Sequence, residues 1–185
     1  MRVDVADAAD VRMMMEAAEL HFGRLDILVN NAGVTHLPQP LEDVTEADFD
    51  RIVAVNMKAI YLAMREAVPR FKANAAGAKG IRGVVLNMAS TAGVSPRPRL
   101  AWYNASKGWV ITATRANAVE LAPFGIRVNA LNPVAGETPL LKMPPVTCAA
   151  TRLRWSPACA WKSMAGAAFK AQPPSQLRRL RRSGC

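Results

Sequence analysis

The sequence predicts an α/β fold in which a mostly parallel sheet is covered by helices on both faces. Three segments have the apolar periodicity of amphipathic helices: 9–22, 45–68 and 103–122. Three short apolar runs alternate with them: 25–30, 84–89 and 126–131. Because helices that connect strands in this alternating order act as crossovers, the pattern favours parallel strands with helices on their faces.

The first helix and strand have clear boundary residues. Apolar side chains recur at intervals of three and four residues: Val11, Met14, Met15, Ala18 and Phe22. Gly23 then ends the helical pattern. The apolar run that follows leads into Asn30-Asn31-Ala32-Gly33, which is typical of a strand that enters a tight loop.

The remaining elements follow in order along the chain. Thr45 is a suitable N-cap for the second helix, which continues to Val68, and we expect Pro69 to bend or end its last turn. Residues 77–83 and 91–98 are rich in glycine or proline and are expected as loops on either side of the second strand. The third helix has a broad apolar face, and Asn132-Pro133 closes the third strand.

Overall composition is that of a folded, water-soluble chain. Of the 185 residues, 51% are hydrophobic and 21% are charged, which argues against disorder and against a small disulfide-bonded scaffold. No apolar run approaches the ~18 residues of a membrane helix. Acidic residues at Asp4 and Asp7 interrupt the place where a signal peptide has its apolar stretch. We therefore expect a cytoplasmic protein with one core.

The formal net charge of +10 is concentrated near the end of the sequence. Residues 1–141 hold 15 basic and 14 acidic side chains, whereas residues 142–185 hold nine basic side chains and no acidic one. All three cysteines lie in this same tail, which lacks sustained periodicity. We therefore place a domain boundary near residue 141, with an irregular basic tail after it.

Tyr103 and Lys107 are spaced to share one face at the start of the third helix. Side chains at i and i+4 lie about 5–6 Å apart at Cβ. A nearby cation favours phenolate, so Tyr103 is a candidate general acid/base with a lowered pKa. For this pair alone, an ordinary amphipathic turn is the favoured interpretation.

Polar residues at the ends of three strands favour the catalytic interpretation of Tyr103 and Lys107 over an ordinary amphipathic turn. Ser90, thirteen residues before Tyr103, follows the second strand, while Asn30–Gly33 and Asn132-Pro133 follow the other two. Ligands of open parallel sheets bind at the carboxyl ends of the strands, so we expect these residues to meet there. The alternative is that they serve only to terminate strands.

Together these motifs resemble the short-chain dehydrogenase/reductase family. The resemblance extends from about residue 3 to residue 141, and its motifs are Asn30-Asn31-Ala32-Gly33, Asn56, Ser90, the pair Tyr103 and Lys107, and 127–133 followed by Thr138. It implies a Rossmann-like doubly wound sheet and NAD(P)-dependent interconversion of an alcohol and a carbonyl.

The resemblance also implies roles for individual residues. Tyr103 would exchange a proton with the substrate oxygen, and Ser90 would hydrogen-bond that oxygen. Lys107 would lower the pKa of Tyr103 and bind the nicotinamide ribose. Asn56 would hold, through its backbone, a water that relays protons from Lys107.

Other residues would bind the cofactor, NAD or NADP, on the same grounds. They are Asp4, Val5, Asn30, Ala32, Gly33, Tyr103, Lys107, Pro133 and Thr138. Among these, Asp4 and Val5 would contact adenine and Thr138 the carboxamide or the phosphates. Small alcohols or carbonyl compounds are implied as substrates, and members of this family are typically homo-oligomers.

Parts of the family pattern have no counterpart in this sequence. The glycine-rich turn that holds the pyrophosphate would precede Asp4, as would the first two strands. We therefore expect an incomplete sheet whose exposed edge at 25–30 promotes aggregation or oligomerisation, and a chain without tight cofactor binding or turnover. Residues 142–185 match no family element, and a change of reading frame near residue 141 is our hypothesis for them.

Two alternatives to an active oxidoreductase stay open. The chain is an inactive fragment, or a module whose basic tail binds nucleic acid or anionic lipid, although no DNA-binding motif accompanies the nine cations. No metal site is expected, because His21 and His36 lack ligand spacing, and we expect both histidines at the surface or at helix ends. Cys148 and Cys159 lack a CxxC partner.

Overall fold

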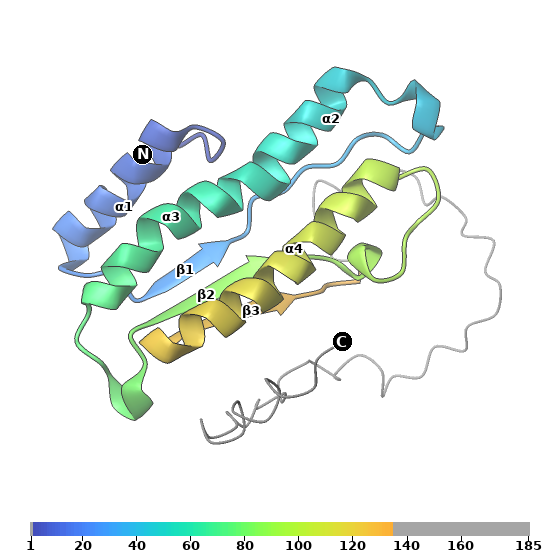
Figure 1. The fold of residues 1–185 in the computed structure, drawn as a ribbon. Coiled ribbons are helices and arrows are strands. Elements are labelled where there is room, and N and C mark those ends of the chain that lie inside the picture. Colours follow the sequence, from blue (N-terminus) through green and yellow to red (C-terminus); the bar gives the residue numbers. More distant parts are fainter. Residues whose placement is uncertain (1, 135–185) are drawn as a thin grey trace, which may run out of the picture. The chain divides into compact units, whose positions relative to one another are not determined.

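A computed structural model describes residues 2–134, which form a three-stranded sheet and its covering helices (Figure 1). The elements are, in chain order, α1 (Ala8–Phe22), β1 (Ile27–Asn30), α2 (Glu46–Ile52), α3 (Ala59–Ala73), β2 (Gly83–Met88), α4 (Ala101–Leu121) and β3 (Ile126–Leu131). Short 3-10 turns lie at Leu41–Asp43, Ala78–Gly80, Thr91–Gly93 and Ala122–Phe124. The alternation of helices and strands expected from the sequence is therefore confirmed.

All strands of the described sheet are parallel, in the order β1-β2-β3. Asn30 lies opposite Asn87, and Met88 lies opposite Leu131, so the strands end within one residue of each other at their carboxyl ends. The polar residues that follow the strands are consequently delivered to one edge of the sheet, which we call the carboxyl-end rim. Within residues 2–134, β1 is an edge strand, as expected.

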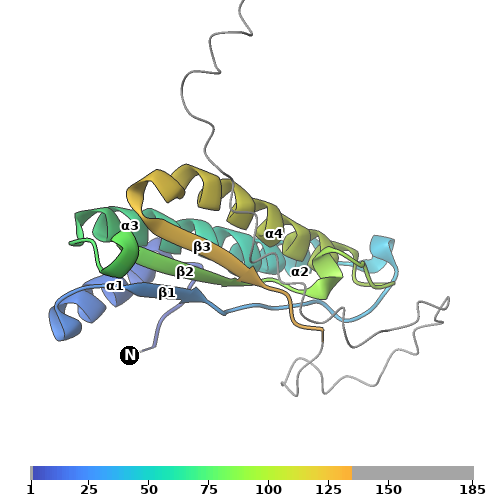
Figure 2. The ribbon, with the colours of Figure 1, turned by 90° about the horizontal axis from the view of Figure 1, so that it is seen from below.

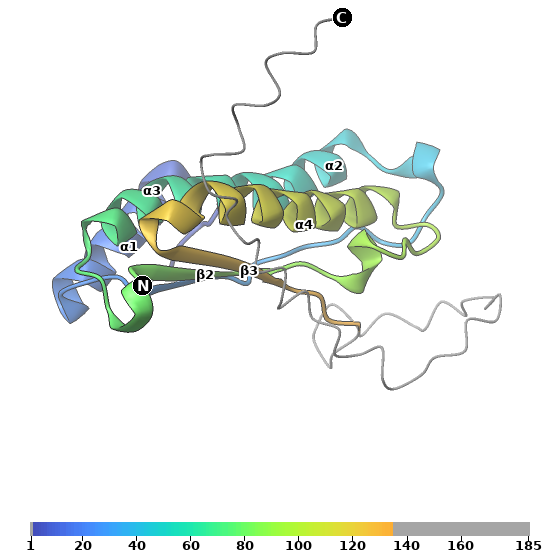
Figure 3. The ribbon, with the colours of Figure 1, turned by 60° about the horizontal axis from the view of Figure 1, so that its bottom comes forward.

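Described helices cover one face of the sheet only, which differs from the coverage of both faces expected from the alternation. Views along the sheet show α3 and α4 on the same side of the strands (Figures 2 and 3). Leu28 and Val85 are buried beneath them, whereas Ile27 and Val29 point to the opposite face and are exposed. The right-handed crossovers β1–α3–β2 and β2–α4–β3 run in the same direction, and this places their helices on one side.

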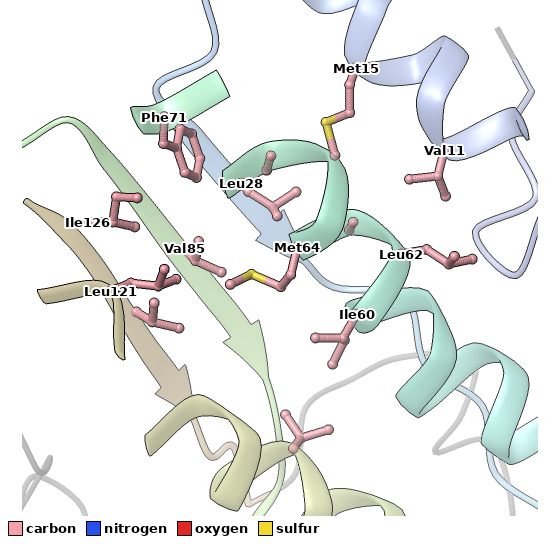
Figure 4. Packing of buried hydrophobic residues seen from close by; sticks show 14 of the residues in the cluster. Val11, Met15, Leu28, Ile60, Leu62, Met64, Phe71, Val85, Leu121 and Ile126 are labelled. Carbon is pink, nitrogen blue, oxygen red and sulfur yellow. The ribbon is translucent and has the colours of Figure 1, made fainter. Parts of the chain in front are cut away.

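The hydrophobic core fills the space between this face of the sheet and the helices (Figure 4). Phe71 and Met64 of α3 lie over Leu28 and Val85, and Val11 and Met15 attach α1 to the same cluster. Arg70 of α3 adds ion pairs to Glu19 and to Glu66 at 2.9 Å. Helix α1 is thus held against α3 by apolar and polar contacts.

The single long helix that the sequence predicts from Thr45 to Val68 is divided in the structure. Thr45 caps α2 through the Asp48 N–H, as expected, but residues Val53–Lys58 form a π-helical segment between α2 and α3. Pro69 lies inside α3, which continues to Ala73 instead of ending there. No described helix, within residues 2–134, is long and apolar enough to cross a membrane.

Candidate active site

Lys107 is the buried charge around which the candidate site is organised. Its side chain points from the second turn of α4 toward the end of β2, where Nζ donates a hydrogen bond of 2.8 Å to the Met88 carbonyl. The same Nζ lies 5.9 Å from the centre of the Tyr103 ring. The i and i+4 spacing therefore brings the ammonium and the phenol to one side of the helix, as the sequence predicts.

Burial also sets the electrostatics of this lysine. Lys107 is only 5% exposed, and burial lowers the pKa of its ammonium because desolvation disfavours the charged form. Among the described residues it makes no ion pair with a carboxylate. A buried cation without a paired anion is costly for folding, and such groups are concentrated at functional sites.

Asn56 joins the loop after β1 to α4 through its side chain. It lies in the π-helical segment, where its amide accepts a 2.8 Å hydrogen bond from the Val34 N–H and donates one of 2.9 Å to the Val34 carbonyl. Its Nδ2 also donates to Ser106 Oγ at 2.9 Å, and that hydroxyl donates to the Tyr103 carbonyl. The side chain of Asn56 thus holds both segments that carry the candidate site.

Gly33 lets the loop after β1 come close to these polar groups. A Cβ added at this position would lie 3.3 Å from Lys107 Nζ and 3.6 Å from Asn56 Oδ1. A side chain at position 33 would therefore require Lys107 Nζ to shift by a few tenths of an ångström, whereas Gly33 leaves the ammonium where it is. Asn31 and Ala32 lie beside it on the exposed side of the loop.

Ser90 lies directly after β2, at the start of the short turn Thr91–Gly93. It is largely buried, and its Oγ accepts a hydrogen bond of 3.1 Å from the Ala92 N–H. Gly93 in this turn presses against α4, because a Cβ there would lie 2.6 Å from the backbone carbon of Lys107. The turn with Ser90 and the helix with Tyr103 are therefore packed backbone to backbone.

Other predicted cofactor contacts differ in how the structure places them. The Pro133 carbonyl accepts the Thr91 N–H at 3.1 Å, which brings the end of β3 beside the Ser90 turn. Asp4 instead makes hydrogen bonds to residues near it in the sequence. Its Oδ1 accepts from the Ala6 N–H, and its own N–H donates to Asp10 Oδ2. Val5 lies in that same turn before α1, and Thr138 lies outside the described residues.

Comparison with known proteins agrees with this geometry. The family model described as "short chain dehydrogenase" matches residues 1–144. The chain belongs to the short-chain dehydrogenase/reductase family. Its sheet and helices are accordingly part of a Rossmann-type α/β fold, as predicted.

Individual members of the short-chain dehydrogenase/reductase family show how much of the fold is matched. A 4-formylbenzenesulfonate dehydrogenase (TsaC1/TsaC2) of Comamonas testosteroni is 45% identical over 141 residues, which are 76% of this chain and 54% of the relative. A 2-(R)-hydroxypropyl-CoM dehydrogenase of Xanthobacter autotrophicus is 38% identical over 75% of this chain and 54% of its own length. The chain spans about half the length of these curated relatives.

Solved structures of the family show the same partial coverage. The crystal structure of a 3-ketoacyl-(acyl-carrier-protein) reductase from Brucella melitensis, complexed with NADH, is 55% identical, with a TM-score of 0.71 over 75% of this chain and 56% of that one. A xylitol dehydrogenase bound to NAD+ is 32% identical, with a TM-score of 0.65 over 71% of this chain and 48% of that one.

For some polar residues of this short-chain dehydrogenase/reductase, the sequence did not predict the contacts or the burial that the structure shows. Ser106 lies in a motif that was recognised, yet its link between Asn56 and Tyr103 depends on contacts between distant segments. His36 was expected at the surface and is instead 1% exposed, with Nδ1 at 2.7 Å from the Leu37 carbonyl. The loop that contains it is covered by neighbouring elements, which no local pattern indicates. His21 is exposed at the end of α1, as expected.

Proposed function

We propose that this chain carries the catalytic residues of an NAD(P)-dependent oxidoreductase that interconverts an alcohol and a carbonyl. The observation that carries the proposal is the buried Lys107 ammonium, hydrogen-bonded to Met88 and close to Tyr103 and Gly33. Burial of an unpaired ammonium costs free energy of folding, and a purely structural lysine does not need to be buried in this way. A proton-transfer site, in contrast, uses a fixed cation beside a phenol.

The described residues fit a dinucleotide cofactor. Gly33 offers a surface without a side chain, edged by the Lys107 ammonium and the Asn56 amide, and such a surface suits a ligand rich in hydroxyl and phosphate oxygens. When bound, the nicotinamide supplies or accepts the hydride. We assign Asn30, Ala32, Gly33, Lys107 and Pro133 to this group.

The assignment of the cofactor also includes residues at the two ends of the family match. Asp4, Val5 and Thr138 remain predicted contacts of NAD or NADP, and their roles rest on the family pattern. Replacing Asp4 by Ala tests the first of these, and Asp7→Ala, which removes the N-cap of α1, is the control for a loosened turn. We expect the Asp4 variant alone to weaken NADH binding, although loss of the turn is a competing cause that the unfolding midpoint detects.

The chain's own residues perform the proton transfer in this proposal. Tyr103 gives its phenolic proton to the carbonyl oxygen of the substrate, or takes the proton of an alcohol in the reverse direction. Ser90 donates a hydrogen bond to the same oxygen as its charge changes. Lys107 stabilises the phenolate of Tyr103, and Asn56 holds the loop after β1 and α4 in their relative positions.

A chimera tests these roles within a complete member of the family. Residues 3–134 replace the corresponding segment of the Brucella melitensis reductase, and NADH oxidation is followed with 3-ketoacyl thioesters and small ketones. We expect turnover that falls at least ~100-fold in Tyr103→Phe, because the proton donor is lost. Tyr61→Phe is the matched control, since Tyr61 is exposed on α3. The proposal is contradicted by a folded chimera that binds NADH without turnover. It is also contradicted if the turnover rate is the same with and without Tyr103→Phe.

We propose small alcohols or carbonyl compounds as substrates, a homo-oligomer as the assembly and the cytoplasm as the location, to be tested by sedimentation and cell fractionation. We also propose that the family domain ends near residue 141. Residues 142–185 lie outside the described residues, and deleting them tests the alternative of a basic tail that binds nucleic acid, which predicts loss of DNA retention.

A further inference from the structure

A row of polar side chains runs from β1 through β2 into α4. Asn30 and Asn87 are opposite each other in the parallel register, and Asn30 Nδ2 donates to Asn87 Oδ1 at 2.8 Å. Asn87 Nδ2 donates to Thr114 Oγ1 at 2.9 Å, and this hydroxyl donates to the Val110 carbonyl at 2.7 Å. Asn87 and Thr114 are buried, and neither belongs to the proposed catalytic residues.

Thr114 determines the direction of every hydrogen bond in this row. An O···O contact of 2.7 Å needs a hydrogen, and the Val110 carbonyl has none, so the hydroxyl hydrogen of Thr114 lies between them. The Thr114 oxygen is then left to accept. Asn87 must therefore turn its NH2 group toward Thr114 and its oxygen toward Asn30, which in turn must offer its NH2 group to Asn87.

This direction leaves one group of Asn30 for a ligand. The Asn30 Oδ1 accepts no hydrogen bond from the described residues, and it is not among the buried unpartnered atoms, so it is open to solvent. Asn30 is the last residue of β1, three positions before Gly33 at the carboxyl-end rim. The rim thus presents a hydrogen-bond acceptor there, which suits a sugar hydroxyl or an amide N–H and disfavours a phosphate.

We propose that Thr114 is a positioning residue for cofactor binding, because it turns the carbonyl oxygen of Asn30 toward the ligand. The inference rests on the proposed function, since the ligand is the sugar hydroxyl or carboxamide of a nicotinamide dinucleotide. Thr114 itself does not reach the rim; it acts through Asn87, across β2, from a position almost two turns after Lys107 in α4.

The orientation of the amides is measured in the complete 185-residue chain. NADH affinity is measured in the chimera that carries residues 3–134 in the Brucella melitensis reductase, because the chain alone is not expected to bind the cofactor tightly. Thr114→Val keeps the shape of the side chain and removes the hydroxyl, so Asn87 loses the acceptor that orients it. Thr114→Ser restores the hydroxyl, and Thr112→Val makes the same change at an exposed position of α4. Side-chain amide signals of Asn30 and Asn87 are recorded by ¹⁵N NMR, NADH affinity by fluorescence and the unfolding midpoint by urea.

We expect Thr114→Val alone to move the Asn30 and Asn87 amide signals and to weaken NADH binding about threefold to tenfold, the scale of one hydrogen bond. If the Asn30 signals do not move in Thr114→Val, the inference is overturned. It is also overturned if they move while the affinity for NADH stays the same. Should the chimera without a Thr114 substitution bind no NADH, the proposed cofactor site fails. Unchanged NADH affinity of Thr114→Val in a chimera that does bind NADH overturns the role of Thr114 alone.

A second measurement does not depend on any variant being folded. In the unmutated chain, a scalar coupling across the hydrogen bond from Asn30 Nδ2 to the Asn87 side-chain carbonyl reads the direction of the row. Detection of this coupling supports the inference. A coupling in the opposite direction, from Asn87 Nδ2 to the Asn30 carbonyl, overturns it, because Asn30 would then present its NH2 group at the rim.

Discussion

On the face of the sheet that α3 and α4 cover, Val85 is 0% and Leu28 is 6% exposed, whereas on the opposite face Ile27 and Val29 are 62% and 52% exposed. Leu28 lies between the two exposed residues in the same strand, β1, because successive residues of a strand point to opposite faces. All four are β-branched or apolar residues of the kind found in buried strands. The difference therefore arises from where the crossover helices lie and from nothing in the strands themselves.

The polar groups of the candidate site follow the covered face. Asn87 lies on the same side of β2 as Val85, and its hydrogen bonds reach the helix that carries Tyr103 and Lys107. The covered face thus holds both the hydrophobic core and the hydrogen-bond row that ends at Asn30. The open face has apolar side chains without described partners, and it offers contact area for other parts of the protein or for other copies of it.

The largest expected effect is on the covered face. Phe71→Ala removes a fully buried ring that packs against Gly83, and we expect a loss of about 3–5 kcal/mol in the free energy of unfolding. Phe22→Ala is the matched control, because Phe22 is exposed at the end of α1. Urea unfolding measures both variants. Equal losses would contradict the assignment of the core to this face.

A smaller loss is expected where the Ser90 turn packs on α4. Gly93→Ala places a methyl group against the backbone of Lys107, which cannot move without shifting the helix, and we expect a loss of about 1–3 kcal/mol. Gly108→Ala in α4 meets only an ordinary contact with the Gly93 carbonyl and gains helix propensity, so it should be neutral or stabilising by up to ~1 kcal/mol. The same unfolding measurement decides between them.

Lys107→Met is expected to stabilise the fold of this chain, and it should remove turnover in the chimera. Burial lowers the pKa of Lys107 from its usual value near 10.5, so the unfolded chain binds more protons than the folded chain between the lowered pKa and 10.5. The free energy of unfolding of the unmutated chain should therefore rise with pH across that window, and this rise should be absent in Lys107→Met. The Met88 carbonyl loses its partner in the variant, which reduces the gain.

That expectation is measured as unfolding free energy against pH for the two chains. Lys72→Met is the control, since Lys72 is exposed and lies over the exposed Phe124 ring at the surface. Parallel pH profiles for the unmutated chain and Lys107→Met would contradict the origin of the pKa shift in burial of Lys107.

The smallest expected effect on stability is on the open face. Val29→Lys replaces an exposed side chain of the edge strand β1, and we expect a change of at most ~0.5 kcal/mol, together with reduced self-association, because a lysine disfavours pairing of edge strands. Val119→Lys, at an exposed position of α4, is the matched control. Light scattering measures the association. Unchanged association in both variants would exclude this face as the contact between copies.

Local patterns were sufficient for most of the architecture. Helical periodicity located α1 and α4, and the apolar runs located all described strands to within two residues. They did not reveal the π-helical segment around Asn56, because its extra residue is stabilised by contacts of Asn56 with Val34 and Ser106. Nor did they show that His36 is buried, since its own neighbours in the sequence are those of an ordinary loop.

The sequence by itself was sufficient to predict the residues that we propose for proton transfer. The spacing of Tyr103 and Lys107 on one helix, with Ser90 after a strand, follows from chain geometry and is readable without a structure. Only the tertiary structure decided which face of the sheet is covered, how deeply Lys107 is buried and which way the amide of Asn30 points. These features depend on contacts between residues far apart in the chain, and therefore no local pattern contains them.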